Sequence, residues 1–329
     1  MIGARIRGGL AALVLGMVAV AAPATGAEEP AQAAALLARA ASTLATRDWA
    51  GVYVQTIAGQ SESFRIARRV EAGGDAERVE ALEGVRREVV RTGDEVHRFL
   101  PERRIVRIER SIGEPGFPRV LPADPASLSG VYRLSIAGTG RVASRDAIIV
   151  RLQAIDALRY SREVWLDRET ALPLKLRVLD ATGSTLEQTA FSEVRVGARV
   201  AAAQVRPGRQ ASYAGWDVQT VTASLPQGTA SPDPTRLGQG FRLLGGVMRR
   251  SVGEVPAATH WAFGDGLAVV SVFIEDGVAG SSAASPSATR HGALGVVEST
   301  VNGRRLTAIG EAPRALLERS LAAAGAALR

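Results

Sequence analysis

The chain has 329 residues, no cysteine and a net charge of +7 at neutral pH. The missing thiols exclude disulfide bonds, thiolate metal sites and a lipid-modified cysteine, and the length is enough for two domains of ordinary size. Lysine occurs once, at Lys175, so arginine supplies nearly all of the positive charge. Arginine suits anionic partners such as lipid phosphates, lipopolysaccharide or an acidic peptide, although a general replacement of lysine by arginine accounts for most of it.

Residues 1–27 have the layout of a secretory signal peptide. Arg5 and Arg7 form a basic start, residues 10–22 are apolar, and small residues lead to Ala27, where we expect cleavage, with Ala24 as the other candidate. The apolar run is shorter than the roughly 20 residues of a membrane span, which argues against an uncleaved anchor. We therefore expect a protein of the periplasm without a nucleic-acid partner, because no nucleic-acid-binding motif is present.

The first part of the mature chain should be one helix followed by many strands. A helix is predicted for residues 31–46, because Leu37, Ala40 and Leu44 share one face that should pack on a sheet. Short connections between the strands favour an antiparallel meander, which encloses an apolar cavity if it curls without closing. Residues 115–125 contain four prolines and should form a long loop, which could serve as a lid. Alternation of apolar and polar residues predicts strands at 52–57, 64–70, 86–92, 95–100, 104–108, 132–137, 147–153, 163–166, 174–179 and 186–196.

A second, smaller domain should follow a polar linker. The strand pattern ends at residue 205, and residues 206–240 read as a linker in which Trp216 is an anchor. Further strands are predicted at 241–250, 267–275, 295–301 and 304–309, with the last two joined by an Asn302-Gly303 hairpin turn. A small-residue loop spans 279–288, and a final helix runs from near Pro313 to near Gly325. The predicted fold is mainly β (α+β), with an unclosed antiparallel β-barrel at 28–205 and a mixed α/β domain at 241–329.

Catalytic motifs are missing from the sequence. His97, His260 and His291 have no second histidine three or four residues away, so the spacing of a helical zinc site is absent. No serine lies in a Gly-x-Ser-x-Gly motif, and the glycines at 138 and 140 precede a strand, whereas a phosphate-binding loop precedes a helix. We therefore predict a binding protein without enzymatic activity, metal or cofactor.

Three segments together resemble the MucB/RseB family of periplasmic regulators of the sigma-E factor. They are ERVEALEGVRREVVR at 77–91, YSREVWLD at 160–167 followed by LPL at 172–174, and FGDGLAVVSVFIE at 263–275 with GEAP at 310–313. The second segment also fits lipoprotein carriers of the LolA type, and the other two are more specific. The chain departs from the family in a long polar insertion at 227–239, which bears on the geometry between the domains.

The resemblance implies both a fold and a function. The N-terminal domain should be similar to LolA, with helices against its open side. The family binds the periplasmic part of a membrane-spanning anti-sigma factor, protects it from regulated proteolysis, and is released by lipid or lipopolysaccharide. A homo-oligomer is left open, and the alternative function is a lipid or lipoprotein carrier of the LolA type.

Candidate binding residues follow from these segments. An apolar half-barrel could accept acyl chains, and Arg86 and Arg87 are hypothesised to lie on an exposed strand at its mouth, where they could bind phosphates. In the second domain, Asp265, Gly266, Leu267 and Val269 are hypothesised to help hold the anti-sigma peptide. In both cases an ordinary structural role is the competing interpretation.

Overall fold

The computed structural model describes residues 25–71, 74–110, 121, 125–208, 215–221, 230–249, 257–276 and 287–328. Nearly all of the predicted signal peptide, most of the proline-rich lid at 115–125 and most of the loop at 279–288 lie outside these residues. The described chain is mainly β, as predicted, with α1 (Thr25–Thr46) near its beginning and α2 (Arg314–Ala327) at its end. Short 3-10 helices lie in the connections: η1 (Pro101–Arg103), η2 (Pro125–Leu128), η3 (Ala202–Gln204) and η4 (Pro234–Arg236).

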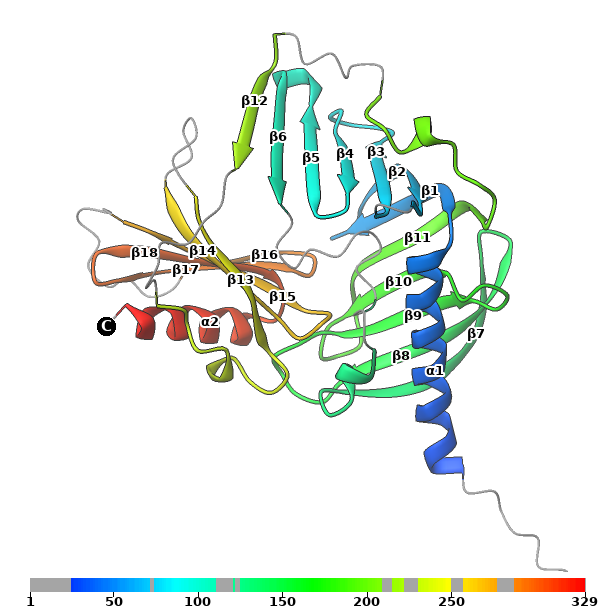
Figure 1. Ribbon diagram of the computed structural model, residues 1–329. Coiled ribbons are helices and arrows are strands. Elements are labelled where there is room, and N and C mark those ends of the chain that lie inside the picture. The colour runs from blue at the N-terminus through cyan, green and yellow to red at the C-terminus, as the bar shows by residue number, and fades with distance from the viewer. Residues whose placement is uncertain are drawn as a thin grey trace, which may run out of the picture.

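Most of the strands form one large sheet. Its order is β12-β6-β5-β4-β3-β2-β1-β11-β10-β9-β8-β7, with β7 and β12 at opposite ends, so this 12-stranded sheet is curved and open (Figure 1). Neighbours pair antiparallel except β12, which runs parallel to β6. The strands are β1 (Trp49–Ile57), β2 (Gln60–Arg69), β3 (Ala76–Ala81), β4 (Glu88–Thr92), β5 (Glu95–Leu100), β6 (Ile105–Arg110), β7 (Tyr132–Val142), β8 (Arg145–Ala154), β9 (Ser161–Asp167), β10 (Pro173–Leu179), β11 (Thr185–Val196) and β12 (Asp217–Val221).

Helix α1 covers the half of this sheet that ends in β7. The predicted apolar face of the helix is confirmed, because Leu37 and Ala40 are fully buried in a cluster with Leu134 and Val150. Next to it, Trp49 is fully buried in a second cluster that includes aromatic residues of β1, β2 and β11. Because no disulfide is available, burial of these apolar side chains is what holds the curved sheet together.

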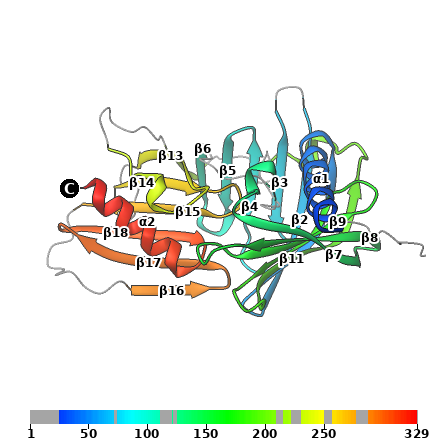
Figure 2. The ribbon, with the colours of Figure 1, turned by 90° about the horizontal axis from the view of Figure 1, so that it is seen from below.

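A six-stranded sheet forms the smaller part of the molecule. Its order is β13-β14-β15-β18-β17-β16, all antiparallel, and α2 lies across one face (Figure 2). Leu316 and Leu317 of α2 pack there on Val297 and Leu306. The predicted hairpin at Asn302-Gly303 is present, with both residues at positive φ. The strands are β13 (Arg242–Arg249), β14 (Ala258–Gly264), β15 (Val269–Glu275), β16 (Ser287–His291), β17 (Leu294–Val301) and β18 (Arg304–Glu311).

A glycine inside α2 offers a stabilising substitution. A Cβ atom at Gly325 would lie 3.5 Å from Val301 and 3.9 Å from Leu306, which are ordinary van der Waals distances. Glycine in a helix is less favourable than alanine by up to about 1 kcal/mol. We expect Gly325→Ala to raise the free energy of unfolding by about 0.5–1 kcal/mol in urea titrations, and a lower unfolding midpoint would contradict this packing of α2 on the sheet.

Several elements differ from the sequence prediction. The sequence does not predict strands β3, β12, β14 and β16, and Ser287 and Ala288, for which it predicts a loop, lie in β16. All five residues of β16 are exposed and β12 is short. Neither strand therefore has the run of alternating buried and exposed residues from which a strand is predicted. Trp216 packs on the outer β4–β6 cluster and leads into β12, so the predicted linker adds a strand to the large sheet. The domain boundaries at 28–205 and 241–329 stay predictions.

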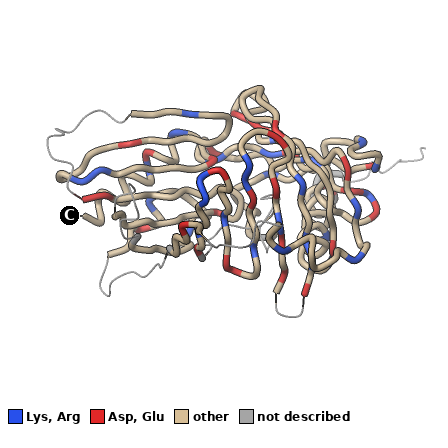
Figure 3. The backbone as a smooth tube through the Cα atoms, turned by 90° about the horizontal axis from the view of Figure 1, so that it is seen from above, with Lys and Arg blue, Asp and Glu red and all other residues tan. Residues whose placement is uncertain are grey.

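Most of the strand arginines have acidic partners on neighbouring strands. Figure 3 shows basic and acidic residues interspersed along the strands. Arg98 pairs with Glu109 at 2.6 Å, and Glu163 lies between Arg151 and Arg177. The half-exposed pair of Arg98 and Glu109 contributes about 0–1 kcal/mol. The buried Glu163 is neutralised by two arginines.

Asp167, the last residue of β9, accepts several hydrogen bonds. Arg145 donates to both oxygens at 3.0 and 2.8 Å, and the backbone N–H of Thr170 donates at 3.0 Å. Burial alone would raise the pKa of Asp167, but these hydrogen bonds outweigh it and the pKa lies below its usual value. The stabilisation is therefore complete above the unfolded-state pKa of about 3.9 and is lost as the pH falls through the lower folded-state pKa.

Replacing Asp167 should accordingly flatten the acid side of the stability profile. We expect Asp167→Asn to lower the free energy of unfolding by about 2 kcal/mol at pH 7, since it removes charge-assisted hydrogen bonds. The difference from wild type should shrink as the pH falls below about 4, where the wild-type carboxylate also becomes protonated. Urea unfolding between pH 2.5 and 7 measures both curves, and a difference that stays constant over this range would contradict the prediction.

Candidate functional site

Arg86 and Arg87 lie in the connection between β3 and β4, and the prediction that they lie on a strand is wrong. Strand β4 begins only at Glu88, because Gly84 turns the chain with a φ of +68°. The connection is held to strand β2. The Leu82 N–H donates to the Ser63 carbonyl at 2.9 Å, and the Glu83 carboxylate accepts from the Ser63 N–H at 2.7 Å. The segment 82–87, called here the β3–β4 loop, is therefore anchored to the sheet.

The two arginines of this loop differ in their surroundings. Arg87 forms an ion pair with Glu62, and its guanidinium stacks on the ring of Phe64, 5.1 Å from the ring centroid. Arg86 is exposed and forms no ion pair with any other residue that the structure describes. Leu82 is 40% exposed and Val85 is 57% exposed, so the β3–β4 loop presents two apolar side chains beside a free guanidinium.

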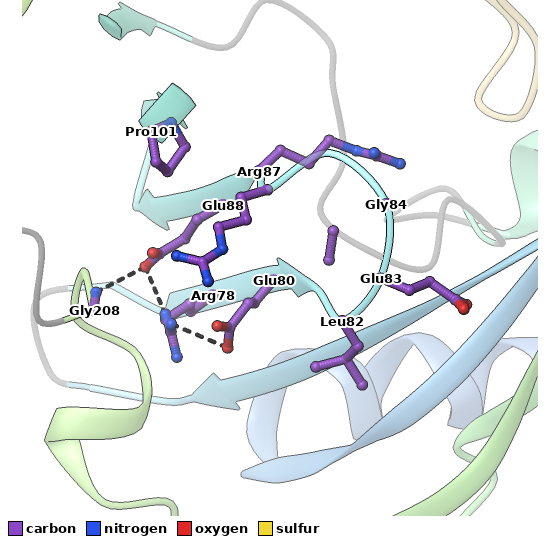
Figure 4. A pocket seen from close by; sticks show the side chains of 11 residues that line it. Arg78, Glu80, Leu82, Glu83, Gly84, Arg87, Glu88, Pro101 and Gly208 are labelled. Atoms are coloured by element: carbon purple, nitrogen blue, oxygen red, sulfur yellow. Dashed lines mark hydrogen bonds and ion pairs between the residues drawn. The ribbon is translucent and has the colours of Figure 1, made fainter. Parts of the chain in front are cut away.

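A pocket of about 470 Å³ lies beside this loop and is lined in part by residues of β3 and β4 (Figure 4). On one side the Glu88 carboxylate accepts from Arg78 at 2.6 Å and from the backbone N–H of Gly208 at 2.9 Å. Arg78 also contacts Glu80 at 3.1 Å, so these three charges largely satisfy one another. The residues lining the pocket are Arg78, Glu80, Ala81, Leu82, Glu83, Gly84, Arg86, Arg87, Glu88, Pro101 and Gly208.

This arrangement is suited to binding. Leu82 can bury apolar area, and Arg86 can donate to a carboxylate or phosphate of a bound molecule. The described residues that line the pocket include no serine, cysteine or histidine that could serve as a nucleophile. Within the described ranges there is also no group of three or more metal-ligating side chains. None of the helices found in the same ranges is long and apolar enough to cross a membrane.

The second set of candidate residues lies at the junction of the two sheets. Asp265 and Gly266 form the predicted turn, in which one Asp265 carboxylate oxygen accepts from the N–H groups of Leu267 and Ala268, and Gly266 has a φ of +104°. Val269, the first residue of β15, is half-buried. Leu267 is 5% exposed and packs into the core of the large domain.

The sequence did not reveal the partner of Asp265. Its second carboxylate oxygen accepts from Arg159 at 2.8 Å, and both side chains are fully buried. Arg159 lies in the connection between β8 and β9, 106 positions earlier in the chain. It stands between a leucine and a tyrosine in a short connection, and no local pattern distinguishes it from the many other arginines.

The fold and these sites together define a class of protein. The chain is a two-domain β protein in which a curved, open sheet with a surface pocket is joined by a buried ion pair to a smaller sheet. Residues 32–209 match the family described as the MucB/RseB N-terminal domain, and residues 229–324 match the MucB/RseB C-terminal domain. The chain belongs to the MucB/RseB family, as its resemblance predicted.

Individual relatives resemble the chain over most of its length. The sigma factor AlgU regulatory protein MucB of Pseudomonas aeruginosa is 31% identical, over 93% of this chain and 94% of the relative. The sigma-E factor regulatory protein RseB of Escherichia coli K12 is 30% identical, over 70% of this chain and 71% of the relative. A solved structure of the Pseudomonas aeruginosa MucA/MucB complex matches with a TM-score of 0.66 at 30% identity, over 88% of this chain and 96% of that chain.

Proposed function

We propose that this chain is a periplasmic negative regulator of an envelope-stress sigma factor. It binds the periplasmic part of a membrane-spanning anti-sigma factor and shields that segment from regulated proteolysis. Lipid or lipopolysaccharide releases it. The observation that carries the proposal is the match of both domains to a family whose members are named sigma factor regulatory proteins, together with the solved complex of one relative with MucA.

The β3–β4 loop offers a physical route to both binding and release. Exposed apolar side chains beside arginine are typical of protein interfaces, where the apolar centre contributes most of the affinity. The same guanidinium can bind the phosphate of a lipid. If the anti-sigma segment and a lipid headgroup compete for Arg86 and Leu82, each lowers the apparent affinity of the other, and release needs no further device.

Exchanging the arginines of the loop tests this site. We expect Arg86→Ala/Arg87→Ala to weaken binding of the anti-sigma segment by about 2–3 kcal/mol, because a guanidinium at an interface is a frequent hot spot. Fluorescence anisotropy of a labelled segment measures the change. Arg103→Ala, an exposed arginine of η1, is the matched control and should bind like wild type. Unchanged affinity for both the segment and lipopolysaccharide in the double variant would remove the β3–β4 loop from the site.

A carrier of lipids or lipoproteins remains the alternative function, because an open sheet with an apolar interior would suit acyl chains. Pull-down from an envelope extract with the tagged mature chain separates the two. The proposal predicts an anti-sigma factor among the retained proteins, whose amount falls when lipopolysaccharide is added. Recovery of a set of lipoproteins without an anti-sigma factor would favour the carrier.

A further inference from the structure

The two domains exchange leucine side chains where they meet. Leu158, in the connection between β8 and β9, is 7% exposed and belongs to the core of the small domain, together with Leu237 and Phe241. Leu267, in the connection between β14 and β15, belongs to the core of the large domain. Each domain thus inserts a side chain into the other, and separating the domains would expose both leucines to water.

A second contact lies at the turn between β16 and β17. Ala293 is fully buried against Tyr160, Val178 and Leu186 of the large domain. A Cβ atom at Gly292 would lie only 2.4 Å from the Ile57 side chain, so the turn lies directly on β1. The domains therefore touch at two separate places, and both contacts are apolar.

Arg159 lies between these contacts and bonds to both domains. Its guanidinium donates to Asp156 of the large domain at 3.1 Å, to Asp265 at 2.8 Å and to the Gln239 carbonyl at 2.8 Å. It also stacks on Phe241, 4.7 Å from the ring centroid. Because the guanidinium is planar and its donors are fixed in direction, these bonds permit one orientation of the Asp265 turn relative to β9.

Such a pair is poorly explained as a source of stability alone. A buried ion pair is often no more stabilising than apolar residues of the same volume, because both charges lose their hydration. Apolar contacts such as the leucine exchange have little directional preference, whereas hydrogen bonds to a guanidinium have a strong one. The geometry therefore suits a role in fixing orientation.

We infer that Arg159 and Asp265 are positioning residues that hold the two domains in the orientation that binds the anti-sigma segment. The identity of the partner rests on the proposed function. On this inference the segment contacts both domains, so its affinity depends on the fraction of molecules in the correct orientation. If loss of the pair lowers this fraction to about one tenth, the apparent dissociation constant rises about tenfold.

The test replaces the ion pair by a neutral hydrogen-bonded pair. In Arg159→Gln/Asp265→Asn the asparagine oxygen still accepts from Leu267 and Ala268, so the turn is retained. The matched control is Arg304→Gln/Asp276→Asn, which makes the same exchange at an exposed ion pair of 2.8 Å within the small domain. Urea unfolding verifies that both variants are folded before they are compared.

The first readout is the distance between the domains. The chain has no cysteine, so spin labels can be placed at Asp146→Cys in the large domain and Thr289→Cys in the small domain, both at exposed positions. Electron paramagnetic resonance measures the distance between the two spin labels. We expect one narrow distance distribution when the labelled chain is otherwise wild type or carries the control exchange, and a broad one when it carries Arg159→Gln/Asp265→Asn. A distribution that stays narrow in this variant would overturn the positioning role.

The second readout is the affinity for the anti-sigma segment. We expect a rise of about tenfold in the dissociation constant for Arg159→Gln/Asp265→Asn and no change for the control. Unchanged affinity together with a broad distance distribution would show that orientation does not govern binding, which also overturns the inference. If wild type fails to bind the segment, the proposed function and the binding half of the inference both fall, and the distances still decide the positioning half.

Discussion

Asp265→Ala should lower the free energy of unfolding by about 3–5 kcal/mol, because it leaves the Arg159 guanidinium buried without its counter-charge. Both side chains are fully buried, so water cannot replace the lost partner. The substitution also removes the acceptor for the N–H groups of Leu267 and Ala268. Urea unfolding followed by circular dichroism measures the loss.

An exposed carboxylate of the same domain is the control for this result. Asp276 pairs with Arg304, but its side chain is 82% exposed, so Asp276→Ala should change the stability by about 0–1 kcal/mol. If Asp265→Ala lowered the free energy of unfolding no more than Asp276→Ala does, the junction between the domains would have to be hydrated, contrary to the burial described above.

Gly51→Ala should destabilise the large domain by about 3 kcal/mol or more, since the added methyl group meets backbone that cannot move aside. A Cβ atom at Gly51 would lie 2.2 Å from the Glu193 carbonyl oxygen of β11. Strand β1 pairs with β11 over its whole length, and this pair joins the two halves of the sheet. Pushing the strands apart would therefore also disturb the cluster around Trp49.

Gly183→Ala separates this collision from the loss of a flexible residue. Gly183 has a φ of +84° and no atom within 4 Å of an added Cβ, so only the backbone penalty of about 1–2 kcal/mol applies. The midpoint of thermal unfolding should be clearly lower for Gly51→Ala than for Gly183→Ala. The reverse order would mean that β1 and β11 are not as closely paired as the structure has them.

Local patterns located the helices and most of the strands, because side-chain periodicity reflects which face is buried. Leu37 and Ala40 identified the packed face of α1, and Asn302-Gly303 identified the β17–β18 hairpin. The pattern failed where a strand has no buried face, as in β16, and where Gly84 turned the chain just before β4. Arg86 and Arg87 were therefore placed on a strand when they belong to a loop.

The junction between the domains lay beyond reach of the sequence. Arg159 and Asp265 are 106 positions apart, and neither Leu158 nor Leu267 belongs to a periodic pattern that would assign it to the other domain's core. Contacts of this kind depend on how two finished sheets meet, which no local spacing encodes. The resemblance to the MucB/RseB family, in contrast, could be recognised from three short segments, and it is the source of the proposed partner class.

The proposed function depends most on one property, the direct association of the mature chain with the periplasmic part of the neighbouring anti-sigma factor. Isothermal titration calorimetry with purified components measures it. We predict saturable binding, with an affinity that falls progressively as lipopolysaccharide is added to the calorimeter cell. If a folded chain gave no heat of binding, the proposed regulatory function would be contradicted. If lipopolysaccharide left the affinity unchanged, the proposed release by lipid would be contradicted.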